Sequence, residues 1–200
     1  MTTAPSGADA TDSIESRILD AALVQFGQLG FKKTTIEDIA RTAGVDRVTV
    51  YRRIGSRDDV VRAVTLREVN AVLTELDEVA ARNDTFADLV ADIFVTIVTR
   101  WRAHPLVQRM LTVEPDRVLP QLTTEGGPAF MVSTAAGTAA IRTAVERGML
   151  ADSPDLNTRV EIACRFVHSL LVQPVGSIPL DTDEQMAEFA RRYLAPIVTG

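Results

Sequence analysis

The stretch from Thr34 to Ile54 limits what this chain can fold into more than any other segment does. Its first half has apolar residues at three- and four-residue spacing: Ile36, Ile39, Ala40 and Ala43. This spacing predicts a short amphipathic helix that the hydroxyl of Thr34 or Thr35 can cap. Gly44 follows directly, and glycine readily adopts the left-handed conformation that ends a helix and turns the chain.

The second half of this stretch predicts another short helix. Asp46 can accept hydrogen bonds from the free amides at its N-terminus, and Val50 and Ile54 would face the core. The remaining positions form a basic, hydroxylated outward face: Arg47, Thr49, Arg52 and Arg53. Because arginine donates hydrogen bonds in a planar fork, this face suits phosphates and guanine edges. We therefore expect a helix-turn-helix over residues 35–54 whose second helix enters the major groove of double-stranded DNA.

Three linked segments of the chain resemble the TetR family of bacterial transcription regulators in order and spacing. They are ILDAALVQFGQLGF (18–31), TTIEDIARTAGV (34–45) and TVYRRIGSRDDVV (49–61). Together they lie within residues 12–72, about a third of the chain. The resemblance and the outward face predict base contacts from Arg47, Val48, Thr49 and Arg52. Phosphate contacts are expected from Thr35, Tyr51, Arg53 and Arg57.

The sequence departs from the family pattern at two places. Arg53, Ile54 and Gly55 stand where the family usually has an aromatic residue pair and then proline, which leaves the role of Arg53 open. Asp46 and Val48 stand where serine and glycine are common. The second departure affects residues that read bases, so the operator sequence is left open.

Charge is distributed unevenly along the chain. The net charge of -6 would by itself argue against a nucleic-acid partner, but residues 31–57 contain seven basic and three acidic residues, or +4. The remainder has 14 basic and 24 acidic residues, or -10. An acidic body with one basic patch favours docking on DNA in a single orientation.

Helical periodicity without a confident strand predicts an all-α fold. We expect a disordered arm over residues 1–11 and a three-helix DNA-binding domain over 12–72, supported by a helix from about 12 to Gly30. A connector helix from Ser56 to about Arg82 would be roughly 40 Å long. It would join the DNA-binding domain to a helical ligand-binding and dimerisation bundle over 73–200, or would serve only as a packing strut.

The last two predicted helices, about 155–172 and 183–198, have apolar residues on more than the one stripe that an internal core needs. This surplus predicts a homodimer through a four-helix interface. The candidate interface residues are Phe166, Leu170, Met186, Phe189 and Tyr193. The alternative is a fully internal helical hairpin.

Apolar side chains are also abundant in the middle helices, which predicts an effector pocket around Trp101. Its apolar lining would be Phe94, Val98, Trp101, Met110, Phe130 and Met131. His104 and Gln108 would supply polar contacts. The alternative is an ordinary filled core, and it is the resemblance to TetR-like proteins that favours a pocket.

Other functions find little support in the sequence. No apolar run approaches a membrane span and no signal peptide begins the chain, so we expect a cytoplasmic protein without membrane contact. Cys164 is expected to be a small buried apolar residue. His104 and His168 lack partners at ligand spacing, so we expect no metal, no cofactor and no enzyme.

These observations favour a DNA-binding repressor that a small, largely apolar effector releases from a near-palindromic operator. One alternative is a ligand-independent DNA-binding dimer whose C-terminal bundle binds only itself or a protein partner. Another is a helical enzyme or carrier with a vestigial N-terminal unit. Release of operator DNA by a metabolite separates the first two, and failure to select any DNA would favour the third.

Overall fold

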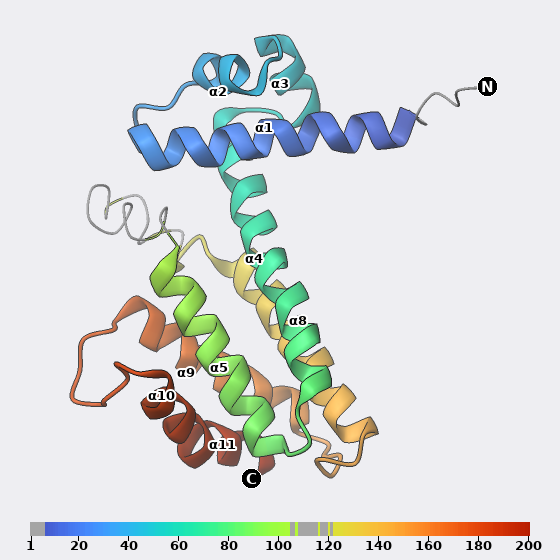
Figure 1. Ribbon diagram of the computed structural model, residues 1–200, viewed down its shortest axis with the longest axis vertical. Helices are drawn as coiled ribbons and strands as arrows, with labels where there is room; N and C mark the ends of the chain where they lie inside the picture. Colours follow the sequence, from blue (N-terminus) through green and yellow to red (C-terminus); the bar gives the residue numbers. More distant parts are fainter. Residues whose placement is uncertain (1–6, 105–106, 108–115, 117–119, 121) are drawn as a thin grey trace. The chain divides into compact units, whose positions relative to one another are not determined.

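The computed structural model of this chain describes residues 7–104, 107, 116, 120 and 122–200 (Figure 1). The described residues form helices and connecting turns without a strand, which confirms the all-α fold class. They belong to two compact units. The described part of the N-terminal unit is residues 7–68, together with 107 and 116. The C-terminal unit comprises Val69–His104 and Pro120–Gly200.

The N-terminal unit contains α1 (Gly7–Leu29), α2 (Ile36–Ala43), α3 (Arg47–Arg53) and the beginning of α4 (Arg57–Arg82). One buried cluster holds these helices together, and each contributes apolar residues from its predicted stripe. Its largest fully buried side chains are Ile18, Phe26, Ile39, Val50, Val60 and Val64. Phe26 packs edge to face against Phe31, with ring centroids 4.6 Å apart.

The first helix begins earlier than the sequence pattern predicts. Helix α1 starts at Gly7, so the expected disordered arm over residues 1–11 is wrong for residues 7–11. No proline follows Pro5 in this part of the chain, and Ala8 and Ala10 are strong helix formers. This segment has no apolar stripe of its own, but a helix that is stabilised by packing farther along extends into it at little cost.

Helix α4 contributes to both units, as expected for a connector. Val60, Val61 and Val64 lie in the N-terminal core, and Leu76 and Val79 are buried farther along the helix. The division between the units falls after Glu68, four residues before the predicted domain boundary at residue 72.

The C-terminal unit adds α5 (Phe86–Ala103), α8 (Gly127–Glu146) and α9 (Leu156–Val172), followed by α10 (Asp183–Phe189), η1 (Ala190–Leu194) and α11 (Ala195–Thr199). Helix α5 packs against α10 and η1, while α8 packs against α9. Leu89, Phe94, Leu156 and Leu194 are fully buried at the centre of this unit. Phe94 and Phe189 bring their ring centroids within 5.7 Å.

The last helical segment was predicted as one α-helix over about 183–198, but its middle, η1, is π-helical. Pro196 lies in the first turn of α11 and lacks the amide hydrogen that would bond back to Arg192. The amide of Ala195 instead bonds to the carbonyl of Ala190, five residues earlier. The wider turn lets the chain continue past the proline without a break.

Candidate nucleic-acid interface

The turn between α2 and α3 is built around Gly44, whose φ of +65° lies in the left-handed region. The amide of Val45 donates to the carbonyl of Ala40 at 3.0 Å, which closes the helix end. From α1, the Nη2 atom of Arg17 donates to the carbonyl of Ala43 at 2.6 Å. A positive charge is favourable at a helix C-terminus, so Arg17 holds the turn from outside the motif.

Helix α2 begins with a reciprocal cap. The amide of Asp38 donates to the Thr35 hydroxyl at 3.2 Å, and the amide of Thr35 donates back to the Asp38 carboxylate at 3.1 Å. Thr35 is therefore the cap, whereas Thr34 is buried and its hydroxyl donates to the carbonyl of Gly30 at 2.7 Å. The hydrogen bond from the Thr35 hydroxyl lowers the pKa of Asp38.

Helix α3 begins with a second carboxylate cap. The Asp46 carboxylate accepts from the amide of Thr49 at 2.6 Å, and this bond is the main reason that the pKa of Asp46 is lowered. Val50 is completely buried and fixes the inward side of the helix. Because α3 is only seven residues long, the cap and this one core contact set its orientation.

Three of the four predicted base-reading residues are exposed on α3: Arg47, Val48 and Arg52. Thr49 is only half-buried, and Val48 is 70% exposed. Tyr51 is half exposed, and the guanidinium of Arg47 lies 5.9 Å from the centre of its ring. The cation-π contact restrains both side chains on the outward face.

Two of the predicted phosphate-binding arginines are less accessible. The Nε atom of Arg57 donates to the carbonyl of Thr34 at 2.9 Å, which ties the start of α4 to the loop before α2. The Nε atom of Arg53 is buried without a hydrogen-bond partner among the described residues. Their phosphate contacts stay predictions, and Arg57 has a structural role that sequence spacing did not reveal.

The departure from the family pattern at Gly55 has a structural reason. Gly55 has a φ of +117°, which a proline ring cannot adopt. A Cβ atom at this position would lie 2.6 Å from the carboxylate of Asp59. That carboxylate accepts from the amide of Ser56 at 2.7 Å and so caps α4, which makes glycine the residue that fits.

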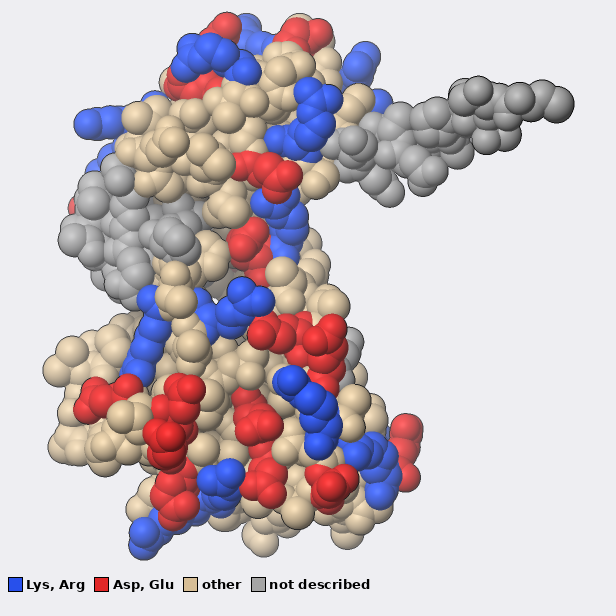
Figure 2. Space-filling view, in the orientation of Figure 1, with Lys and Arg blue, Asp and Glu red and all other residues tan. Residues whose placement is uncertain are grey.

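The charge pattern predicted from sequence is visible on the surface. Figure 2 shows Lys and Arg side chains around α2 and α3 of the N-terminal unit. On the visible face of the C-terminal unit, acidic side chains are scattered among neutral residues and several Lys and Arg side chains. The segment 31–57, which has a charge of +4 in a chain of net charge -6, contains α3 and its exposed face.

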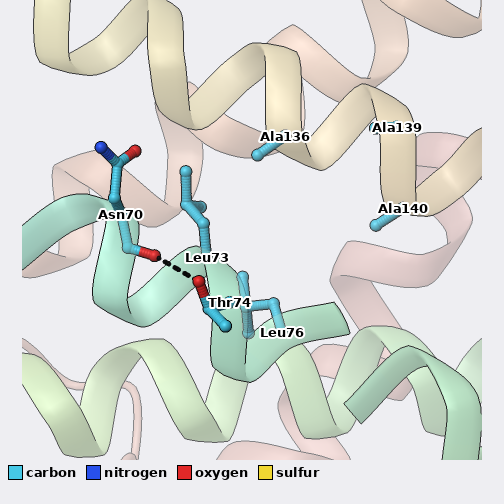
Figure 3. A pocket seen from close by; sticks show the side chains of 7 residues that line it. All are labelled: Asn70, Leu73, Thr74, Leu76, Ala136, Ala139 and Ala140. Carbon is cyan, nitrogen blue, oxygen red and sulfur yellow. Dashed lines mark hydrogen bonds between the residues drawn. The ribbon is translucent and has the colours of Figure 1, made fainter. Parts of the chain in front are cut away.

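In the C-terminal unit, a cavity of about 370 Å³ lies between α4 and α8 (Figure 3). Its lining is apolar apart from two side chains: Asn70, Leu73, Thr74, Leu76, Ala136, Ala139 and Ala140. The Thr74 hydroxyl donates to the backbone carbonyl of Asn70 at 3.1 Å, as the dashed line in Figure 3 shows. The small alanine side chains of α8 leave the space open opposite the leucines of α4.

Among the described residues predicted to line an effector pocket, none lines this cavity. Phe94 and Val98 are buried in the core of the C-terminal unit, and their role as pocket residues stays a prediction. Phe130 packs against His168, Met131 is 66% exposed, and Trp101 and His104 are half-buried. Gln108 and Met110 lie outside the described residues.

The predicted dimer residues divide into two groups. Met186 and Phe189 are buried in the core of their own unit, which leaves them little surface for a partner. Leu170 packs against the same core. Phe166 and Tyr193 are exposed, and Ile162 on α9, which was not among the predicted interface residues, is exposed as well. Helical periodicity could not separate inner from outer residues because both sides of these helices are apolar.

Other kinds of site find no support in the described part of the chain. Within it, no group of His, Cys, Asp and Glu side chains is arranged to hold a metal ion. No helix among these residues has the length and apolar character needed to cross a membrane. Cys164 is partly buried, and burial raises the pKa of its thiol.

A capped helix-turn-helix with a basic, exposed second helix defines the N-terminal unit as a DNA-binding module. The family model described as bacterial regulatory proteins, tetR family, matches residues 18–64. Over these residues the chain is similar to that family, and it has a helix-turn-helix there.

Relatives of known name extend the comparison beyond the N-terminal unit. The transcriptional regulator AlkX of Mycobacterium tuberculosis is 26% identical over 125 residues, which cover 61% of this chain and 59% of that protein. The chain thus spans less than two thirds of that relative. The transcriptional repressor KstR2 of Rhodococcus jostii is 24% identical, with 98% of this chain and 96% of that protein covered.

A solved structure supports the same fold. It is that of the TetR family repressor AlkX from a Dietzia strain, implicated in the biodegradation of n-alkanes. The TM-score is 0.67 at 20% identity, with 92% of this chain and 94% of that one covered. At this identity the likeness concerns the fold alone.

Proposed function

We propose that this chain is a transcriptional repressor that binds a near-palindromic operator through α3 and releases it when a small, largely apolar effector binds. The outward face of α3 carries the proposal, because Arg47, Val48 and Arg52 are all exposed on a helix whose opposite side is fixed by Val50. The +4 charge of the surrounding segment favours the same contact with DNA. The similarity to a repressor over nearly the whole chain supports repression rather than activation.

The cavity between α4 and α8 is the effector site that the described residues support best. Leucine and alanine side chains make most of its lining, and the amide of Asn70 is a polar group for orienting a ligand. Similarity in fold to a repressor implicated in n-alkane biodegradation supports an apolar effector. Because α4 also contributes Val60 and Val64 to the N-terminal core, an effector that favours one position of α4 would change DNA affinity by its differential binding.

A near-palindromic operator requires two copies of the chain. We propose that Ile162 and Phe166 on α9, with Tyr193 on η1, form the centre of a two-fold interface, since all three are exposed apolar side chains. Ile162→Asp should give monomers by light scattering while helical content stays unchanged. Phe189→Asp would not serve this purpose, because Phe189 belongs to the unit's own core. A dimer that persists in Ile162→Asp would place the interface elsewhere.

The proposal for DNA binding is tested by selecting bound sequences from a random DNA pool. Arg52→Ala should weaken binding to the selected operator by about 1–3 kcal/mol and relax the preference at one base pair. Failure of the wild-type chain to select any sequence would contradict the proposed function. If Arg52→Ala has the operator affinity and base preference of wild type, α3 does not read the bases.

Effector binding is tested with linear alkanes, fatty acids and small aromatics added to the operator complex. Binding of the compound, followed by calorimetry, should have the same midpoint as the release of operator DNA. Ala140→Leu should fill part of the cavity and abolish release without affecting DNA binding. Ala135→Leu is the matched control, because Ala135 is exposed on the same helix and lies outside the cavity lining. Equal release in both variants would exclude this cavity, and no release by any compound would favour the ligand-independent dimer.

A further inference from the structure

Val48 is the apolar residue at the centre of the outward face of α3. Its side chain is 70% exposed, whereas Val50, two residues along, is completely buried. Successive helical residues are rotated by about 100°, so Val48 and Arg52, four apart, share a face that lies opposite Val50. An apolar side chain and a guanidinium therefore stand side by side where the helix is most accessible.

Neither the packing of the N-terminal unit nor the start of α3 accounts for this valine. Val48 is absent from the buried cluster that holds the unit together, including its partly buried members. The cap of α3 is the bond between the Asp46 carboxylate and the amide of Thr49, which does not involve the Val48 side chain. A β-branched residue is also a poorer helix former than alanine at an exposed position. The helix would thus be at least as stable with alanine here.

We infer that Val48 determines operator specificity by packing against the 5-methyl group of a thymine; this inference rests on the proposed DNA-binding function. In the major groove, that methyl group is the one apolar feature among the base-pair edges, which otherwise present hydrogen-bond donors and acceptors. A valine side chain can neither donate nor accept a hydrogen bond, so it favours thymine over the other bases. Arg52 beside it suits the O6 and N7 acceptors of guanine.

The geometry of α3 also limits where the thymine lies. Four residues of helix separate Val48 from Arg52 along the axis by about 6 Å. Base pairs follow one another at about 3.4 Å. The thymine should therefore lie within about two base pairs of the position that loses its preference in Arg52→Ala.

The experiment uses the full-length protein and its selected operator, in which each thymine is replaced in turn by deoxyuridine. This replacement removes the methyl group and leaves the hydrogen-bonding groups of the base unchanged. For wild type, one position in each half-site should weaken binding by about fourfold, the effect of burying one methyl-sized group. In Val48→Ala the same replacement should have no effect, and the unmodified operator should bind about as weakly as the modified operator binds wild type.

Arg52→Ala is the matched control, because it removes the neighbouring side chain and should keep the sensitivity to deoxyuridine. The thermal unfolding temperature of Val48→Ala should equal or exceed that of wild type. A folding defect would then not account for its weaker binding to DNA. A selected operator with no sensitive thymine would overturn the inference and leave the proposed function standing. Equal sensitivity in wild type and Val48→Ala would overturn it as well, whereas failure to select any DNA would contradict both.

Discussion

The two units of this chain stabilise their helices in different ways. In the N-terminal unit, α2, α3 and α4 all begin with a side chain that accepts a hydrogen bond from a backbone amide three residues later: Thr35, Asp46 and Ser56. In the C-terminal unit, α5 and α10 begin with the same kind of bond, to Thr85 and Thr182, whereas α8 and α9 begin without one. The caps matter most for α2 and α3, because a short helix is marginal unless its ends are satisfied.

The core contacts differ in the same sense. Phe189 is the centre of an aromatic group in the C-terminal unit, with ring centroids 5.7 Å from Phe94, 6.0 Å from Phe166 and 5.2 Å from Tyr193. Long-range polar contacts occur in both units: Arg17 reaches the carbonyl of Ala43 in the N-terminal unit, and Arg102 reaches that of Leu180 in the C-terminal unit. The N-terminal cluster is smaller, and Arg57 also supplements it through the carbonyl of Thr34. Local caps and single hydrogen bonds therefore position the DNA-reading helix, while aromatic packing supports the C-terminal bundle.

The largest expected effect tests the packing half of this comparison. Phe189→Ala should destabilise the C-terminal unit by about 3–5 kcal/mol, because it removes a buried ring and leaves a cavity among its neighbours. In the monomeric Ile162→Asp background, Tyr193→Ala, at an exposed site in the same aromatic group, should cost much less. Urea unfolding followed by circular dichroism measures both. Similar losses in the free energy of unfolding would show that the buried ring and the exposed ring contribute equally to stability.

A smaller effect tests the role of the caps. Asp46→Ala should destabilise α3 by about 1 kcal/mol and speed hydrogen exchange of its amides, because the Thr49 amide loses its acceptor. The matched variant in the C-terminal unit is Asp155→Ala, since Asp155 occupies the same position before α9 but makes no cap hydrogen bond. Hydrogen exchange with mass spectrometry reports each helix separately. An equal change at α9 would contradict the contrast between the units.

The smallest effect concerns the charge on the same cap. The pKa of Asp46 is lowered in the folded chain, mainly by the bond from the Thr49 amide. Its contribution to stability is therefore fully present above the unfolded pKa, near 4, and is lost as the pH falls through the lower folded pKa. Asp46→Asn keeps a hydrogen-bond acceptor but does not titrate. Between pH 5 and 3, the α3 amides of this variant should therefore lose less protection from hydrogen exchange than those of wild type.

Hydrogen exchange of α3 measured across that pH range distinguishes the wild type from Asp46→Asn. Asp155→Asn should leave the pH dependence of α3 as it is in wild type, because Asp155 lies in the other unit. Identical curves for wild type and Asp46→Asn would show that the carboxylate's charge does not stabilise the cap.

The sequence was a good guide wherever neighbours along the chain determine structure. The stripe of Ile36, Ile39, Ala40 and Ala43, the turn at Gly44 and the cap at Asp46 were all predicted, and all are present. Each depends on residues at most four positions apart, so spacing and chemical type suffice to predict it. The same local information predicted that Arg47 and Arg52 would lie on the outward side of α3, whereas the base contact of Val48 was expected partly from the family resemblance.

Sequence was a poorer guide where residues far apart in the chain meet. Phe94 and Phe189 are separated by 95 positions, and no periodicity distinguishes a ring that fills the core from one that lines a pocket. The cavity likewise depends on alanines of α8 lying opposite leucines of α4, and both residue types are also ordinary core residues. The early start of α1 escaped prediction because the packed helix beyond it stabilises a segment that has no apolar stripe of its own.

By itself, the amino-acid sequence determined the all-α class, the helix-turn-helix and which side of this motif faces solvent. It could do so because hydrophobic periodicity, glycine conformation and side-chain capping act over one or two helical turns. Only the tertiary structure decided that Phe189 is internal while Tyr193 is exposed, that Arg57 binds the carbonyl of Thr34, and where the C-terminal unit leaves a cavity. The physical reason is that burial and packing depend on which faces of distant helices meet. Many apolar sequences fill such an interface equally well, so the pattern along one helix does not specify its partner.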